Sequence, residues 1–218
     1  MKRGGGGAKG RAFELAVCRQ LSRWWSGGKR DDGFWHTHSS GAIGTRRGRR
    51  GSVQQHGDVM AMDAEGLPLL RLCTIEIKVG YGRWCAVDYL DGAPEAKPPL
   101  LTKFLSQAVA EADVAGVPWF LLILKRDRRQ PMIVVPQTMV EAWKVWTGGE
   151  MVVRHIVLSA VEIAAVPLPV PLEYTWTVLR LEHFLDTFKP SFFICKAREP
   201  VYGVQASSTR GFRRVTSP

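Results

Sequence analysis

The chain has 218 residues, of which 45% are hydrophobic, so it can bury a substantial core and is not a disordered protein. No stretch approaches the roughly 20 apolar residues of a membrane span, and the first residues lack the apolar segment of a secretory signal. Four scattered cysteines without a CxxC pair exclude a disulfide framework. We expect a globular protein of the cytoplasm with reduced cysteines and no membrane partner.

The formal net charge of +10 is distributed unevenly along the chain. Residues 1–50 carry a net charge of +9 and residues 196–218 a net charge of +4, whereas residues 51–195 carry −3. Clustered Lys and Arg side chains favour a polyanionic partner, because phosphates release their counterions when these side chains approach. Charge alone leaves open both nucleic-acid binding and simple solvation of the basic ends.

The first third of the chain predicts a tail, a helix, a strand and a loop. We expect a flexible tail over residues 1–8 and a helix over residues 9–25, where apolar residues recur at helical spacing before a Gly-Gly stop. Glu14 lies beside the apolar face of this helix. Residues 34–38 predict a short strand, and residues 39–52, rich in Gly, Ser and Arg, predict a mobile basic loop.

The next segment carries most of the functional information. Residues 57–62 and 69–79 are predicted to be two strands joined by a turn. In the second strand, isoleucines alternate with Glu76 and Lys78, so the two charged side chains share one face while the apolar side chains occupy the other. Two opposite charges therefore project together from an otherwise apolar strand.

The rest of the chain continues the mixture of helices and strands. Helices are predicted over residues 101–115, 139–146 and 181–188, and strands over residues 117–125, 132–135, 152–158 and 174–179. The order is typical of an α/β or α+β fold. We expect a core over residues 9–135, an extension or small module over residues 136–195, and a basic flexible tail over residues 196–218.

Asp58, Glu76 and Lys78 are suited to the cleavage of phosphodiester bonds. This reaction needs an attacking water, neutralisation of charge on the phosphate and a stabilised leaving oxygen, and carboxylates that hold Mg²⁺ serve all three needs. A metal can bridge Asp58 and Glu76 on neighbouring predicted strands, while Lys78 could orient or deprotonate the water or neutralise developing charge. Glu14 could supply a third carboxylate. The sequence predicts a magnesium-dependent nuclease in which Mn²⁺ can substitute.

The order of these residues resembles the PD-(D/E)xK nuclease superfamily. The similarity extends over residues 9–135 and rests on three motifs: Glu14, Gly57-Asp58 and Glu76-Ile77-Lys78. Within the superfamily, the chain is most similar to the archaeal-type Holliday-junction resolvases, because Ser40-Gly41 lies in the loop between the first strand and Asp58. The family's proline before the catalytic Asp is Gly57 here, and a minimal resolvase has no counterpart of the segment after residue 135.

The resemblance implies a restriction-endonuclease-like core, with a mixed central β-sheet flanked by helices and a C-terminal extension. It also implies a homodimer that cuts two strands of a branched DNA, leaves 5′-phosphates, and is encoded by a virus or mobile element. The implied site consists of the metal-binding carboxylates, the catalytic lysine, a loop serine and, more weakly, a helical glutamine: Glu14, Asp58, Glu76, Lys78, Ser40 and Gln107.

Basic and imidazole side chains near this site have two interpretations. The basic residues expected to contact DNA phosphates, rather than solvent alone, are Lys9, Arg11, Arg46, Arg47, Arg49 and Arg50. A zinc site built from His36, His38 and His56 is an alternative, but no further His or acid follows at the spacing of the common zinc-hydrolase motifs. Contact with DNA phosphate or ordinary strand packing is favoured for these histidines.

Three functions remain open. The favoured function is a magnesium-dependent DNA endonuclease that resolves branched DNA. A second keeps the chemistry but acts on duplex DNA, as a restriction-like or repair nuclease. A third, of another class, is a non-catalytic DNA-binding protein in which Asp58 caps a turn and Glu76 forms a solvent-facing pair with Lys78 on an edge strand.

Overall fold

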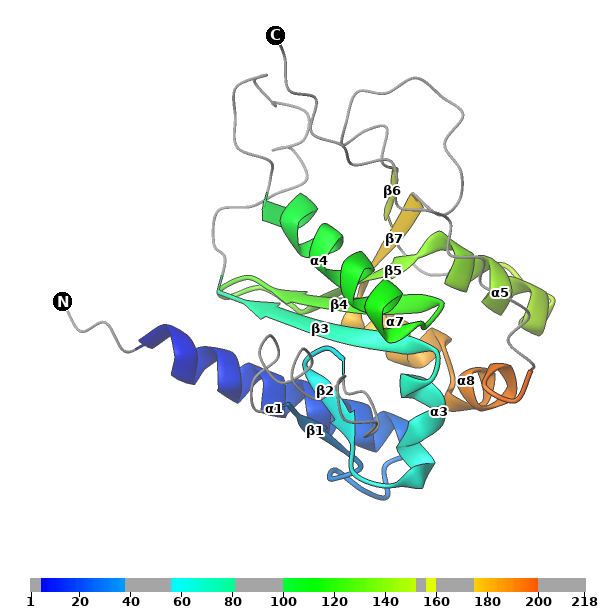
Figure 1. Ribbon diagram of the computed structural model, residues 1–218, viewed down its shortest axis with the longest axis horizontal. Coiled ribbons are helices and arrows are strands. Elements are labelled where there is room, and N and C mark those ends of the chain that lie inside the picture. The colour runs from blue at the N-terminus through cyan, green and yellow to red at the C-terminus, as the bar shows by residue number, and fades with distance from the viewer. Residues whose placement is uncertain (1–4, 38–55, 81–99, 152–155, 160–174, 200–218) are drawn as a thin grey trace, which may run out of the picture.

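A computed structural model describes residues 5–37, 56–80, 100–151, 156–159 and 175–199. The helices are α1 (Gly5–Trp25), α3 (Leu67–Leu70), α4 (Leu100–Ala115), α5 (Gln137–Thr147), α7 (Leu181–Thr187) and α8 (Pro190–Lys196), with a 3₁₀ turn η1 (Ala64–Gly66). The strands are β1 (Phe34–His36), β2 (Val59–Ala61), β3 (Cys73–Val79), β4 (Trp119–Lys125), β5 (Met132–Pro136), β6 (Ile156–Ser159) and β7 (Thr175–Arg180). Figure 1 shows helices on both sides of a mixed sheet.

The described strands form a five-stranded sheet and a separate two-stranded ribbon. The order in the sheet is β3-β4-β5-β7-β6, with β3 parallel to β4 and the other neighbours antiparallel. Because β3 and β4 are parallel, the chain has to return along the sheet between them, and α4 lies in that connection. β1 pairs with β2 in the ribbon, with Trp35 opposite Met60.

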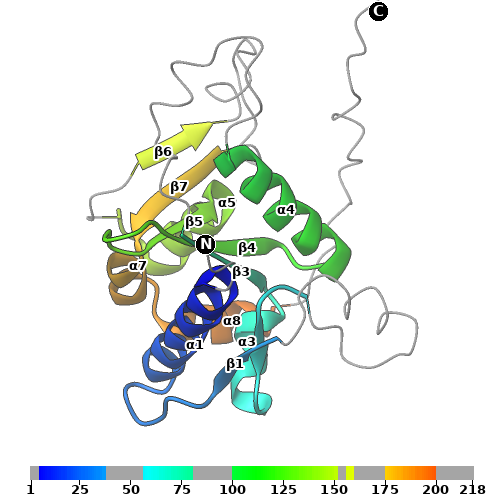
Figure 2. The same ribbon diagram turned by 90° about the vertical axis from the view of Figure 1, so that its left-hand side faces the viewer.

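The two faces of the sheet are covered by different helices. Val17 and Leu21 of α1 pack in the larger core cluster with Ile75 and Ile77 of β3, together with buried residues of α5, α7 and α8. α4 covers the opposite face, where its apolar side chains pack against alternate residues of β4, β5 and β7. Figure 2, which looks along α1, shows α1 and α4 on opposite sides of β3 and β4. Ile75 and Ile77 of β3 therefore face α1, which confirms the predicted apolar face of this strand.

The predicted hairpin between residues 57–62 and 69–79 is wrong. β2 pairs with β1 rather than with β3, and the intervening residues form η1 and α3. The apolar run from Leu67 to Leu70 is helical because Pro68 lies in the first turn of α3, where a missing backbone N–H costs no hydrogen bond. The strand that carries Glu76 therefore begins at Cys73 rather than near residue 69.

Most other predicted elements are confirmed, with shifted ends. α1 begins at Gly5 rather than near Lys9, and the seven-residue helix α8 was not predicted. The predicted strand over residues 152–158 is described only from Ile156 onwards. β7 pairs with β5, so the segment after residue 135 adds strands to the same sheet. None of the described helices is long and apolar enough to cross a membrane.

Candidate active site

Asp58 is held beside β3 although it precedes β2, which does not pair with that strand. The amide of Asp58 donates to the carbonyl of Ile75 at 2.7 Å, and its carboxylate oxygen Oδ2 accepts from the amide of Ile77 at 2.8 Å. Thr37 donates its amide to the carbonyl of Asp58 at 3.0 Å, which ties the end of β1 to the same residue. These bonds fix a buried carboxylate beside the stretch of β3 that carries Glu76.

Gly57 occupies a position that no other residue would fit easily. Its φ is +81°, and a Cβ built there would lie 2.6 Å from the carbonyl oxygen of Ile75. Proline, the family residue before the catalytic Asp, fixes φ near −65° and is incompatible with this backbone. The glycine therefore allows the chain to approach β3 closely enough for Asp58 to make its two bonds.

Glu76 is almost completely buried and shares one of its oxygens between two donors. Its side chain is 1% exposed, and Oε2 lies 2.8 Å from Nζ of Lys78 and 3.1 Å from Nε2 of Gln107. Lys78 Nζ also lies 5.9 Å from the ring centroid of Phe104 on α4. The burial excludes the interpretation of Glu76 and Lys78 as a solvent-facing pair, although β3 is an edge strand of the sheet.

The charge of Asp58 disfavours the ionisation of two neighbouring carboxylates, Glu76 and Glu14. Burial, and then the charge of Asp58, raise the pKa of Glu76 to about 7, against the opposing effect of Lys78. Burial and the charge of Asp58 also raise the pKa of Glu14, while Arg11 and Lys78 lower it. Glu14 therefore approaches the same region from α1. A bound cation would relieve this repulsion, which agrees with the predicted magnesium site.

The carboxylate oxygens of Asp58 and Glu76 are the type of ligand that Mg²⁺ prefers. Hydrogen-bond donors among the described residues contact only one oxygen of each central carboxylate, Oδ2 of Asp58 and Oε2 of Glu76. A hard cation, which takes carboxylate and water ligands, could use the second oxygen of each. In the described part of the chain, no group of three or more His, Cys, Asp or Glu side chains is gathered into a ready metal cage. The arrangement fits an ion held by two carboxylates and completed by water or substrate.

Two histidines each lie near a carboxylate of a neighbouring helix. Nδ1 of His36 lies 3.8 Å from Oε2 of Glu14, and Nδ1 of His56 lies 3.8 Å from Oε2 of Glu111. His36 is buried beside α1, as expected for strand packing. The described histidines thus form no zinc cluster, and His38 lies outside the described residues.

Glu111 was not predicted as a residue of this site. It lies on α4 four residues after Gln107, and its charge raises the pKa of Glu76. Residues four apart on a helix share one face, so the position of Gln107 could have indicated Glu111. Of the remaining predicted residues, Lys9 pairs with Asp127 and Arg11 is exposed on α1. The others lie outside the described residues: Ser40, Arg46, Arg47, Arg49 and Arg50.

Comparison with known proteins agrees with this geometry. A family model described as "Phage putative PDDEXK endonuclease" matches residues 6–194. No curated protein and no solved structure matches the chain significantly. The match confirms the resemblance to the PD-(D/E)xK superfamily and gives no support for a closer similarity to Holliday-junction resolvases. Since the match spans Glu14, the GD and ExK motifs and most of the chain, the protein belongs to this phage PDDEXK endonuclease family.

Proposed function

We propose that the protein is a magnesium-dependent endonuclease that hydrolyses phosphodiester bonds in DNA. The observation that carries this proposal is the buried pair of Asp58 and Glu76 with Lys78 beside it. Buried carboxylates that repel one another are costly, and they are typical of sites where a cation or a reaction uses them. The family match and the basic ends of the chain both support a polyanionic substrate.

Each residue of the site has a distinct proposed role. Mg²⁺ bound between Asp58 and Glu76 would supply charge neutralisation and a more acidic water. The hydrogen bonds from Ile77 and Gln107 fix the two carboxylates so that their second oxygens remain for the ligand. Lys78 donates to Oε2 of Glu76, and from there its ammonium group can orient the attacking water or stabilise charge on the phosphate.

Glu14 is proposed as a third contributor to the metal site. Its carboxylate is partly buried and senses the charges of both Asp58 and Lys78. α1, which carries Glu14, covers the face of the sheet opposite α4. Because Glu14 senses the charge of Asp58, we propose that it contacts the ion directly or through a water. The reaction transfers the phosphoryl group to water and breaks the bond to the 3′ oxygen, which leaves a 5′-phosphate as the resemblance implies.

The finer proposals concern the substrate and the assembly. A branched DNA substrate, a homodimer and a role for Ser40 rest on the sequence resemblance to resolvases alone. An activity on duplex DNA uses the same residues and is the alternative. The non-catalytic alternative predicts no use for a buried Glu76, which makes it the least economical of the three.

Cleavage of a labelled four-way junction and a matched linear duplex by the purified protein with Mg²⁺ tests these proposals. The expected result is Mg²⁺-dependent cutting that Glu76→Ala abolishes. Symmetric cutting of the junction alone would support the resolvase proposal, whereas cutting of both substrates would support a broader nuclease. DNA binding without cleavage of either substrate would contradict the enzymatic proposal.

A further inference from the structure

A basic groove lies between α1 and the turn that joins β4 to β5. It has a volume of about 520 Å³ and is open to solvent. Its walls are formed by Lys9 and Phe13 of α1 and by residues 125–128, and Val79 at the end of β3 also lines it. The β4–β5 turn and the first half of α1 lie at the same end of the molecule in Figure 1.

The charge of this groove suits an anion. Four of its lining residues are basic, Lys9, Lys125, Arg126 and Arg128, against a single acid, Asp127. Nζ of Lys125 lies 5.2 Å from the ring centroid of Phe13, so this ammonium group is held at the groove. Lys9 pairs with Asp127 across the groove, and both side chains are about half exposed. An exposed pair of this kind is weak and leaves the site with an excess of positive charge.

Arg128 is held in a backbone conformation that normally favours glycine. Its φ is +58°, and it is the one non-glycine residue with positive φ among the described parts of the chain. The left-handed conformation is unfavourable for a residue with a Cβ, so glycine would suit the turn better. An arginine at such a position is most simply explained by a use for its side chain.

The groove is connected to the candidate active site through the elements that line it. Val79 directly follows Lys78 on β3, and Phe13 directly precedes Glu14 on α1. Val79 lies three positions after Glu76, which corresponds to about 10 Å along a strand. At this distance the groove can reach a neighbouring phosphate of the strand whose scissile bond is bound at Glu76.

We propose that this groove binds the phosphates of the DNA strand that flanks the scissile bond. The inference rests on the proposed nuclease function and extends it, because Lys125, Arg126 and Arg128 become contacts that hold the substrate in register. Such contacts position the backbone without reading its sequence. Part of the binding surface therefore lies on the β4–β5 turn, together with Lys9 on α1.

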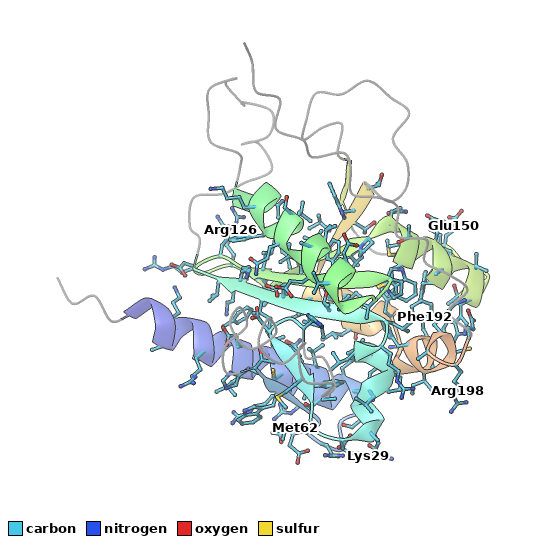
Figure 3. The ribbon with its side chains drawn as sticks, in the orientation of Figure 1. Lys29, Met62, Arg126, Glu150, Phe192 and Arg198 are labelled. Carbon is cyan, nitrogen blue, oxygen red and sulfur yellow. The ribbon has the colours of Figure 1, made fainter. Side chains whose placement is uncertain are left out.

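The test compares two double variants that remove the same charge from different places. Arg126→Gln with Arg128→Gly alters the groove, whereas Lys29→Gln with Arg198→Gln alters positions that Figure 3 places far from Arg126. Binding of a 20-base-pair duplex is measured in EDTA, which removes divalent metal, over a series of NaCl concentrations. The slope of log K against log salt reports the number of phosphates contacted, at about 0.9 per contact.

The groove variant is expected to lower this slope by about 2 and to weaken binding at least about tenfold at fixed salt. The control variant is expected to change the slope by less than about 0.5. Thermal melting of both proteins verifies folding, and Arg128→Gly should not lower the melting temperature because glycine adopts this φ freely. Equal slopes for the two variants, or no binding by the unsubstituted chain, would overturn the inference.

Failure of this inference and failure of the nuclease proposal give different results. If the groove variant binds DNA like the control while the unsubstituted protein still cuts DNA with Mg²⁺, only the groove assignment is wrong. If the groove variant loses binding but the unsubstituted protein cuts no DNA, the groove still binds DNA phosphates, while the nuclease proposal and the place of the groove beside a scissile bond fail.

Discussion

Among the individual residues, Glu76 shows most clearly that stability and chemistry oppose each other in this protein. A carboxylate that is 1% exposed loses hydration, and Asp58 adds repulsion that Lys78 offsets only in part. Such a group lowers the stability of the metal-free protein whenever it is ionised. The proposed metal site would give this unfavourable placement a physical reason, because a bound cation favours the ionised carboxylate.

Glu76→Gln is expected to stabilise the metal-free protein at high pH and to abolish cleavage. The folded-state pKa of Glu76, about 7, lies above its ordinary value of 4.5, so its favourable contribution is present below about pH 4.5 and is lost as the pH rises through about 7. Glutamine keeps an acceptor for Gln107 and does not ionise. We expect a gain of about 1–3 kcal/mol at pH 8.

Urea unfolding in EDTA at pH 8 and pH 5 measures this difference in unfolding free energy. The gain should shrink at pH 5, where Glu76 is protonated in the folded chain and close to its ordinary pKa in the unfolded chain. A glutamine variant that is less stable than the parent at pH 8 would show that the pair with Lys78 outweighs the burial and repulsion.

Gly57→Ala is expected to be much more damaging than Gly80→Ala. Both glycines have positive φ, +81° and +89°, so alanine adds a backbone cost of about 1–2 kcal/mol at either position. Only at Gly57 does the added Cβ also meet backbone, 2.6 Å from the carbonyl oxygen of Ile75, which adds about 1–3 kcal/mol. Chemical denaturation of both variants measures the difference, and equal losses would contradict the proposed close approach.

The central residues of the candidate site could be predicted because their relation is local in sequence. Glu76 and Lys78 share a face of one strand by its period of two, which requires no knowledge of the fold. Glu111 and His56 depend on how α4 docks over the sheet and on the path of the chain before Gly57. The spacing from Gln107 could place Glu111 on a shared helix face, but no short pattern encodes the tertiary contacts of Glu111 and His56.

At the scale of secondary-structure elements, the β1–β2 ribbon is attached to the core through α1. The hydroxyl of Ser22 donates to the carbonyl of Cys18 at 2.8 Å and accepts from the amide of Phe34 at 2.9 Å. Ser22 is 1% exposed, so no water replaces it easily. The ribbon leads directly to Asp58, through the bond from Thr37, and this attachment therefore helps to position the Asp58 carboxylate.

Ser22→Ala is expected to lower the unfolding free energy by about 1–3 kcal/mol, because it leaves the amide of Phe34 buried without an acceptor. Ser26→Ala is the matched control near the end of the same helix. Ser26 accepts from the amide of Arg30, but that contact is exposed and water can replace it. Thermal or urea unfolding compares the two, and similar stabilities would refute the role assigned to Ser22.

The elements themselves were predicted more reliably than their pairing. The helix over residues 101–115 and the strands that became β4 and β5 have strong apolar patterns, and the structure confirms them. The hairpin was wrong because pairing depends on competing tertiary partners: β2 meets β1, and β3 meets β4 across a long crossover. A strand's own sequence does not specify its neighbour.

For the whole molecule, the segment after residue 135 contributes to the same core as the candidate site. β7 pairs with five residues of β5, and Nε1 of Trp24 on α1 donates to the carbonyl of Phe188 at 3.0 Å. The rings of Phe184 and Phe188 stack with centroids 4.8 Å apart in the same cluster. The two parts of the chain are therefore expected to unfold together.

Truncation after Val135 is expected to abolish cooperative unfolding and cleavage, because it exposes β5 and the apolar face of α1. Circular dichroism during urea titration of the fragment and of the full chain measures cooperativity. A fragment of residues 1–135 that unfolds sharply and still cuts DNA would show that the nuclease core is independent of the remaining strands and helices.

The most direct test of the central claim is a paired measurement on the full chain and its Asp58→Asn variant. DNA cleavage is followed with Mg²⁺ and with EDTA, and DNA binding is measured for both proteins. The amide oxygen of the substituted side chain can still accept from the amide of Ile77, so folding should be retained, while the loss of charge removes a proposed metal ligand. We predict Mg²⁺-dependent cleavage by the parent, at least about 100-fold slower cleavage by the variant and similar binding by both. Equal cleavage by the two proteins, or no cleavage by the parent, would contradict the assignment of this site.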